Sequence, residues 1–156
     1  MPERTEPLTP TAPAAAAPAK GPVTLRRRLG DGAETLVAER LAASGWTVLA
    51  AGVRVGRDEL DLICVEPGSP PTLVFVEVRS RSSSRFGAPE ETLDAAKIAR
   101  TYRAAFALLR QGCLPDGRSM PRLPWRVDLV AVDGRLLAGH DAGEVRVRHI
   151  RGVAPD

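Results

Sequence analysis

The chain has 156 residues, of which 44% are hydrophobic and 26% are charged, enough for one globular domain with a real core. A net charge of +3 excludes a strongly charged polyelectrolyte, and Lys20 and Lys97 are the only lysines among 22 basic residues. The chain is predicted to be a cytoplasmic protein with no membrane contact. Its two cysteines form no CxxC motif, and it has neither a long apolar run nor a start that resembles a signal peptide.

The N-terminal segment is rich in proline and has no hydrophobic periodicity. It holds six of the fourteen prolines and the run Ala14-Ala15-Ala16-Ala17. Dense proline opposes both helix and sheet, so residues 1–28 are predicted to be a disordered tail and residues 29–156 one domain. Arg26-Arg27-Arg28 is either a solvated linker or a phosphate contact.

A helix is predicted from Asp31 to Ser44. Asp31 and Glu34 resemble a capping box, and Gly45 is a natural residue to end the helix. Glu34 lies on the same face as the apolar stripe, so it either caps the helix or points toward the sheet. The stripe consists of Val37, Ala38, Leu41 and Ala42.

The remaining elements predict a mixed sheet with helices packed on it, an α/β fold. The second helix runs from Asp94 to Gln111 and ends at Gly112. Its predicted inward stripe is Ile98, Tyr102, Ala105 and Leu109. The predicted strands are residues 46–49, 59–66, 73–79, 125–132 and 145–150, and the second and third form an antiparallel hairpin through the turn at 67–72.

The hairpin carries the chemistry. Strand alternation puts Asp61 on one face with Glu59, and Glu77 on one face with Arg79, while Leu60 shares the other face with Leu62 and Cys64. A hairpin symmetric about Ser69 places Asp61 directly opposite Glu77 and Glu59 opposite Arg79, with Cβ atoms of such pairs roughly 4.5–5.5 Å apart.

Two opposed carboxylates in apolar strands need compensation, because like charges there are destabilising. A shared proton, a salt bridge to Arg79 or a divalent cation would each provide it. Oxygen ligands without nearby His or Cys favour Mg²⁺ or Mn²⁺, and Glu34 could supply a third carboxylate. The alternative is that Glu77 pairs with Arg79 or Arg81 on a solvated face.

Spaced motifs recur in order along residues 31–133. They are Glu34-(x)6-Leu41-(x)3-Gly45-Trp46-x-Val48-Leu49, Glu59-Leu60-Asp61-Leu62-Ile63, Phe75-Val76-Glu77-Val78-Arg79-x-Arg81, Phe86-Gly87-x-Pro89, Lys97 and Arg126-Val127-Asp128-Leu129-Val130. On these motifs the chain resembles the bacterial YraN-like family. The resemblance implies a restriction-endonuclease-like mixed β-sheet flanked by helices, related in architecture to archaeal Holliday-junction resolvases.

The resemblance also assigns expected roles. It makes Asp61 the aspartate of a PD-(D/E)xK-type signature, Glu77 its acidic partner and Glu34 a further metal ligand, with Mg²⁺ or Mn²⁺ activating water for attack on a phosphodiester. Arg79 stands where the signature has lysine, and arginine cannot act as a base because it stays protonated. Lys97 could substitute for that lysine or be an exposed helix-surface residue.

Three functions remain open. The first is a metal-dependent, structure-selective endonuclease, with DNA as the expected partner and a homodimer as the expected assembly. The second is a nucleic-acid-binding module without cleavage, favoured by Arg79, and the third is a protein-interaction domain on an old nuclease fold. The phosphate contacts expected in the second are Arg79, Arg81, Arg85, Arg100 and Arg103.

Other sites find little support. His140 and His149 have no metal-ligand spacing and are predicted to be surface or edge residues. Aromatic residues make up 4% of the chain, too few to predict a base-stacking platform. The basic strand at 145–150 either guides a nucleic-acid backbone or is a charged edge that resists aggregation.

Overall fold

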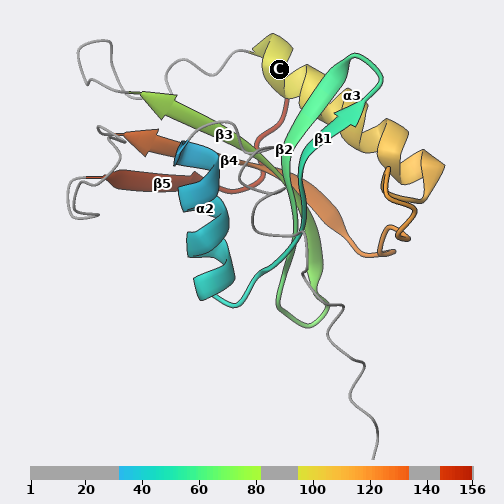
Figure 1. The fold of residues 1–156 in the computed structure, drawn as a ribbon, viewed down its shortest axis with the longest axis horizontal. Helices are drawn as coiled ribbons and strands as arrows, with labels where there is room; N and C mark the ends of the chain where they lie inside the picture. Colours follow the sequence, from blue (N-terminus) through green and yellow to red (C-terminus); the bar gives the residue numbers. More distant parts are fainter. Residues whose placement is uncertain (1–31, 82–94, 134–144, 156) are drawn as a thin grey trace, which may run out of the picture.

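The computed structural model describes residues 32–81, 95–133 and 145–155 (Figure 1). The predicted tail and the two predicted helix caps, Asp31 and Asp94, lie outside these residues. Gly45 and Gly112, the residues predicted to end the two helices, have the positive φ angles of +90° and +78° that favour glycine. The elements in chain order are α2 (Gly32–Ala43), β1 (Thr47–Val55), β2 (Asp58–Glu66), β3 (Thr72–Arg81), α3 (Ala95–Gln111), β4 (Trp125–Asp133) and β5 (Arg146–Ile150).

The five strands form one mixed sheet in the order β1-β2-β3-β4-β5. Three neighbouring pairs are antiparallel, and β3 pairs with β4 in parallel because α3 carries the chain back between them. The predicted α/β class, a mixed sheet flanked by helices, is thus confirmed. No helix among the described residues combines the length and the apolar character needed to cross a membrane.

Strand β1 is longer than its sequence predicts. The prediction ended at Leu49, but the strand continues to Val55 and pairs with β2 along its whole length. A register shift between Val48 and Ala50 and a positive φ of 59° at Gly52 let it bend with the twisted sheet. Gly52 is thus a bend inside the strand and does not end it.

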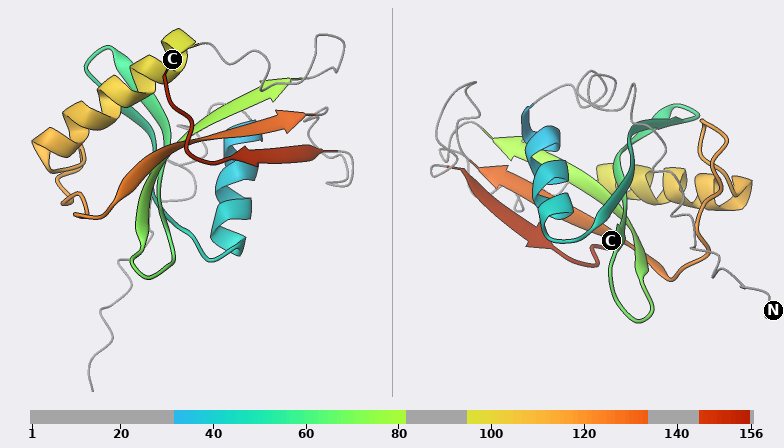
Figure 2. Two further views of the ribbon diagram at one scale, coloured as in Figure 1. Left: turned by 180° about the vertical axis from the view of Figure 1, so that it is seen from behind. Right: turned by 60° about the horizontal axis from the view of Figure 1, so that its bottom comes forward.

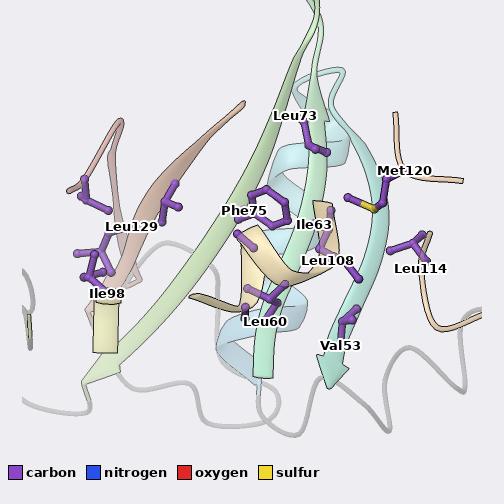
Figure 3. Packing of buried hydrophobic residues seen from close by; sticks show 14 residues of the cluster. Val53, Leu60, Ile63, Leu73, Phe75, Ile98, Leu108, Leu114, Met120 and Leu129 are labelled. Carbon is purple, nitrogen blue, oxygen red and sulfur yellow. The ribbon is translucent and has the colours of Figure 1, made fainter. Parts of the chain in front are cut away.

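Each face of the sheet is covered by one helix (Figure 2). Helix α2 packs over one apolar cluster, in which Val37, Leu41 and Leu62 are buried. Helix α3 packs over the other, which is centred on Phe75 and includes Leu108 (Figure 3). Because both faces are covered, the strands between them read as continuous apolar runs rather than as alternating ones.

The helix faces differ slightly from their predictions. The buried positions of α3 are Ile98, Thr101, Ala104, Ala105 and Leu108. Tyr102 and Leu109, which were predicted to face inward, are half-buried at the edge of this stripe. The buried face is thus rotated by part of a turn, and this rotation places Thr101 over the sheet. On α2, the predicted Ala42 is exposed and Ala33 is buried in its place.

Candidate active site

The β2–β3 hairpin has the predicted register. Leu62 pairs with Val76, and one step further along both strands brings Asp61 opposite Glu77. The regular pairing ends here, because the backbone N–H of Val78 donates to Oδ2 of Asp61 at 2.9 Å. The Asp61 carboxylate therefore accepts a hydrogen bond that a backbone carbonyl of β2 would accept in a regular ladder. The two strands separate at this point.

The side chains of β2 also break their regular alternation between the two faces of the sheet near the end of this pairing. Leu60 was predicted to share a face with Leu62 and Cys64. Instead it is buried under α3, while the other two are buried under α2. Burial raises the pKa of the Cys64 thiol to about 12, so this cysteine is an inert core residue rather than a nucleophile.

Glu77 is almost fully buried, with 2% of the residue exposed. Nζ of Lys97 lies 2.9 Å from Oε1, and the Thr101 hydroxyl lies 3.5 Å from Oε2. The Lys97 contact is an ion pair without hydrogen-bond geometry, so Oε1 has no hydrogen-bond partner among the described residues. The alternative that Glu77 lies on a solvated face with Arg79 or Arg81 is wrong, because α3 covers it and presents Lys97 to it.

Arg79 lies two residues beyond Glu77 on β3 and is half-buried. Within the described ranges its side chain forms no hydrogen bond or ion pair. Glu59, which was predicted to face it, pairs instead with Arg54 of β1 at 3.8 Å on the surface. The cation that contacts the buried carboxylate is therefore Lys97, which comes from the helix and not from the strand.

Asp61 is strongly perturbed. Burial, followed by the charge of Glu77, raises its pKa to about 8, although the hydrogen bond from the Val78 amide opposes the rise. The charge of Glu34, at the start of α2, raises the pKa further. Asp61 therefore keeps its proton at neutral pH unless a cation neutralises the site.

This perturbation predicts a pH-dependent effect of Asp61→Asn on stability. The folded-state pKa of about 8 lies above the ordinary value of 3.8, so wild-type stability falls as the pH rises between these values. The asparagine oxygen can still accept the Val78 hydrogen bond but carries no charge. We expect the variant to be more stable than wild type by roughly 1–3 kcal/mol at pH 8, with the difference vanishing near pH 4. Urea unfolding at several pH values measures this, and an equal difference at every pH would contradict it.

The two carboxylates line an open pocket of about 380 Å³. Helix α3 forms one wall, and the tip of the β1–β2 hairpin contributes the other. Four acidic and three basic side chains line it, so charges of both signs face the same space. The lining residues are Arg57, Asp58, Glu59, Asp61, Glu77, Lys97, Arg100 and Thr101.

The predicted phosphate-binding arginines are only partly gathered at this pocket. Arg100 lines it. Arg103 lies beside it and donates to Asp58 through Nε and Nη2, both at 2.8 Å. The Arg81 side chain and Arg85 lie outside the described residues.

The donor set fits a hard divalent cation in part. The carboxylates of Glu77 and Asp61 offer oxygen ligands of the kind that Mg²⁺ and Mn²⁺ prefer, and Oε1 of Glu77 is held by its ion pair with Lys97 at 2.9 Å. In the part of the chain that the structure describes, no three His, Cys, Asp or Glu side chains form a complete ligand group. Glu34 is near enough to affect Asp61, but its predicted role as a third ligand remains a prediction.

A second polar cluster lies on the other face of the sheet and was not predicted. Asp128 of β4 is 0% exposed and accepts hydrogen bonds from Arg126, from His149 at 2.7 Å and from the Gly152 amide at 3.0 Å. His149 was predicted to be a surface or edge residue, and only the position on an edge strand agrees with the structure. The strand it occupies is an edge strand, but its ring turns inward and contacts Trp46. The alternation of side chains along β4 places Asp128 on a core-facing position, and this pattern could have predicted its burial.

Fold and site together define an α/β protein with a carboxylate pair in an open pocket at one end of its sheet. Residues 33–132 match the family described as "Uncharacterised protein family UPF0102", and the chain belongs to this family. This confirms the family resemblance carried by the motifs.

Individual relatives match over most of their length. A UPF0102 protein of Roseiflexus castenholzii is 39% identical over 125 residues, which are 80% of this chain and 91% of that protein. The UPF0102 protein STH1475 of Symbiobacterium thermophilum is 41% identical over 117 residues, 72% of this chain and 91% of that protein. Pyrococcus furiosus SfsA in complex with Ca²⁺ superposes with a TM-score of 0.34 at 14% identity, covering 83% of this chain and 65% of that chain.

Proposed function

We propose that the chain is a divalent-metal-dependent nuclease that hydrolyses nucleic-acid phosphodiesters in the Asp61–Glu77 pocket. The observation that carries the proposal is a buried carboxylate pair, one member of which has a pKa raised to about 8, at the wall of a pocket that three basic residues also line. A strongly perturbed acid in a pocket is typical of a functional site. In contrast, the hydrogen bonds to the buried Asp128 lower its pKa to about 2.

Asp61 and Glu77 would hold Mg²⁺ or Mn²⁺. A cation there would neutralise the two charges, lower the pKa of an attacking water and stabilise charge on the phosphate. The Val78 amide fixes the orientation of Asp61, and Thr101 lies against the second oxygen of Glu77. Both ligands are therefore held in place before a substrate arrives.

Lys97 is proposed to fill the place that the signature lysine has on the strand. Its Nζ reaches the carboxylate from α3, and its side chain is 37% exposed, so it also faces the pocket. From there its charge would stabilise the transition state. Arg57 and Arg100 line the same pocket and would neutralise the phosphates that flank the scissile bond. DNA remains the proposed substrate and a homodimer the proposed assembly.

A second candidate function is nucleic-acid binding without cleavage. The observation in its favour is that Lys97 already pairs with Glu77, while Arg79 replaces the strand lysine. In that case the pocket would bind phosphate but hold no cation. The two candidates differ in their response to a metal rather than in their affinity for nucleic acid.

Binding of Mn²⁺ separates the candidates without a cleavage assay. Under the nuclease proposal we expect Mn²⁺ to raise the thermal midpoint of wild type, because a ligand at 100 times its Kd stabilises by about 2.7 kcal/mol. Glu77→Gln should lose this shift, whereas Glu39→Gln, on the exposed side of α2, should keep it. Equal shifts in all three proteins would contradict binding at this site. The absence of any shift would favour the second candidate.

A further inference from the structure

Four aromatic rings gather where α3 packs beside the start of β4. The Phe106 ring meets the Trp125 ring edge-on, with centroids 5.1 Å apart and an interplanar angle of 88°. Tyr102 and Phe75 contact the same indole, at 5.9 and 5.7 Å. The chain has three Phe, two Trp and one Tyr, so most of its few aromatic residues lie in this one place. We call the four rings of Phe75, Tyr102, Phe106 and Trp125 the aromatic platform. The composition of the chain could not predict it, because the fold brings these rings together.

Phe106 is the unusual member of the group. Phe75 is fully buried and Tyr102 and Trp125 are half-buried, but 53% of Phe106 is exposed. Among the described residues it is the one large hydrophobic side chain that is exposed. Its ring is held in place by Trp125 while its outer surface faces solvent. The packing of the core does not account for an aromatic residue at this position.

The surroundings of Phe106 are basic. On a helix, residues three and four apart are neighbours, so Arg103 and Arg110 flank Phe106 on the surface of α3. Both arginines are exposed. A flat apolar ring one turn from the exposed Arg110 complements a ligand that has a flat apolar face and a negative charge beside it, whereas the Arg103 guanidinium already pairs with Asp58.

The platform is continuous with the pocket. Arg103 forms an ion pair with Asp58, which lines the pocket. The exposed surface of α3 that carries Arg103 and Phe106 therefore begins at the pocket rim. Lys97 and Phe106 lie nine positions apart on α3, which is about 13 Å along the axis and, at 3.6 residues per turn, on opposite sides of the helix. A strand whose phosphate enters the pocket would reach Phe106 by crossing the exposed face of α3 past Arg103, which pairs with Asp58 at the pocket.

We propose that Phe106, flanked by Arg103 and Arg110, is a stacking subsite for an unpaired nucleotide of the nucleic acid bound at the pocket. This inference rests on the proposed function and specifies its substrate class. Every base has a face that can stack on an aromatic ring, whereas a duplex keeps those faces inside its own stack. The favoured substrate is thus one with unpaired nucleotides next to the scissile bond, such as a single strand or a branch point.

Binding in EDTA tests this without any dependence on cleavage. The probes are short fluorescein-labelled oligonucleotides, as single-stranded DNA, single-stranded RNA and blunt duplex DNA, measured by anisotropy. We expect Phe106→Ala to weaken single-strand binding by roughly 5- to 150-fold, Phe106→Leu to weaken it as much, and Phe106→Trp to keep wild-type affinity. Duplex affinity should stay the same in all variants.

The arginines have a matched control in Arg40. Arg110 and Arg40 each lie in the last turn of a helix, but Arg40 is on α2 and far from the platform. Arg110→Ala should reduce the slope of log affinity against log salt by about 0.7 for a single strand, and Arg40→Ala should leave it unchanged. Equal changes in the two variants would overturn the role of Arg110.

The remaining outcomes distinguish the inference from the proposed function. If wild type binds nucleic acid and Phe106→Leu binds single strands as well as wild type does, the stacking subsite is wrong and the nuclease proposal stands. If wild type binds none of the probes, both fail. If Phe106→Ala leaves affinity unchanged and instead converts a dimer to a monomer in sedimentation, the platform is covered by a second copy of the chain, which also overturns the inference.

Discussion

Replacement of Asp128 by alanine is expected to lower the free energy of unfolding by about 3–5 kcal/mol, because it leaves buried partners without their acceptor. Arg126 would lose two hydrogen bonds and keep its ion pair with Glu66, while His149 and the amide of Gly152 would lose one each. The last of these joins the C-terminal segment to β4, where Val153 also bonds to Val127. The thermal midpoint should fall by roughly 10–15 °C.

The pH dependence of this effect has a defined sign. Burial alone would raise the pKa of Asp128, but the hydrogen bonds from His149 and Arg126 outweigh it and lower the pKa to about 2. The stabilisation is therefore complete above the ordinary value of 3.8 and is lost as the pH falls toward 2. The difference between wild type and Asp128→Ala should shrink over that interval.

Asp116→Ala is the matched control for Asp128→Ala. Asp116 also pairs with an arginine, Arg118 at 2.8 Å, but both side chains are more than half exposed. Its removal should cost no more than about 1 kcal/mol. Chemical unfolding of the two variants beside wild type measures both values. A similar cost at the two positions would contradict the role assigned to the buried network.

The hairpin and its carboxylates were predictable from the sequence for a physical reason. The turn at 67–72 and two apolar strands of similar length leave few registers that bury both strands, so Asp61 and Glu77 had to meet. Glycines that need a positive φ marked the ends of both helices. These are local constraints, and the residues that impose them are adjacent in sequence.

The contacts that could not be predicted join distant segments. Lys97 reaches Glu77 only because α3 is rotated so that Thr101 faces the sheet, and the apolar pattern fixes such a rotation to no better than part of a turn. The pairing of Asp128 with His149 depends on β5 lying beside β4. The exposed position of Phe106 likewise follows from the same rotation of the helix.

Glu77→Gln is expected to reduce metal-dependent cleavage by roughly 10²- to 10³-fold or more, because it removes a charge that must face the cation and phosphate. The substitution keeps the shape of a side chain that is 2% exposed and removes the charge that raises the pKa of Asp61, while the Lys97 side chain, which loses its ion pair, is 37% exposed. The variant should therefore remain folded, with a thermal midpoint no lower than a few degrees below that of wild type. A loss of cleavage in a folded protein then reports on chemistry rather than on unfolding.

The most direct test is cleavage of labelled branched, single-stranded and duplex DNA by wild type, Glu77→Gln and Glu39→Gln, purified in parallel, with Mn²⁺ or Mg²⁺. Glu39 is exposed on α2 and serves as the control carboxylate. The nuclease proposal predicts cleavage by wild type and Glu39→Gln, and its loss in Glu77→Gln. Equal cleavage by all three would indicate a contaminating enzyme, and no cleavage of any substrate with either metal would contradict the proposal.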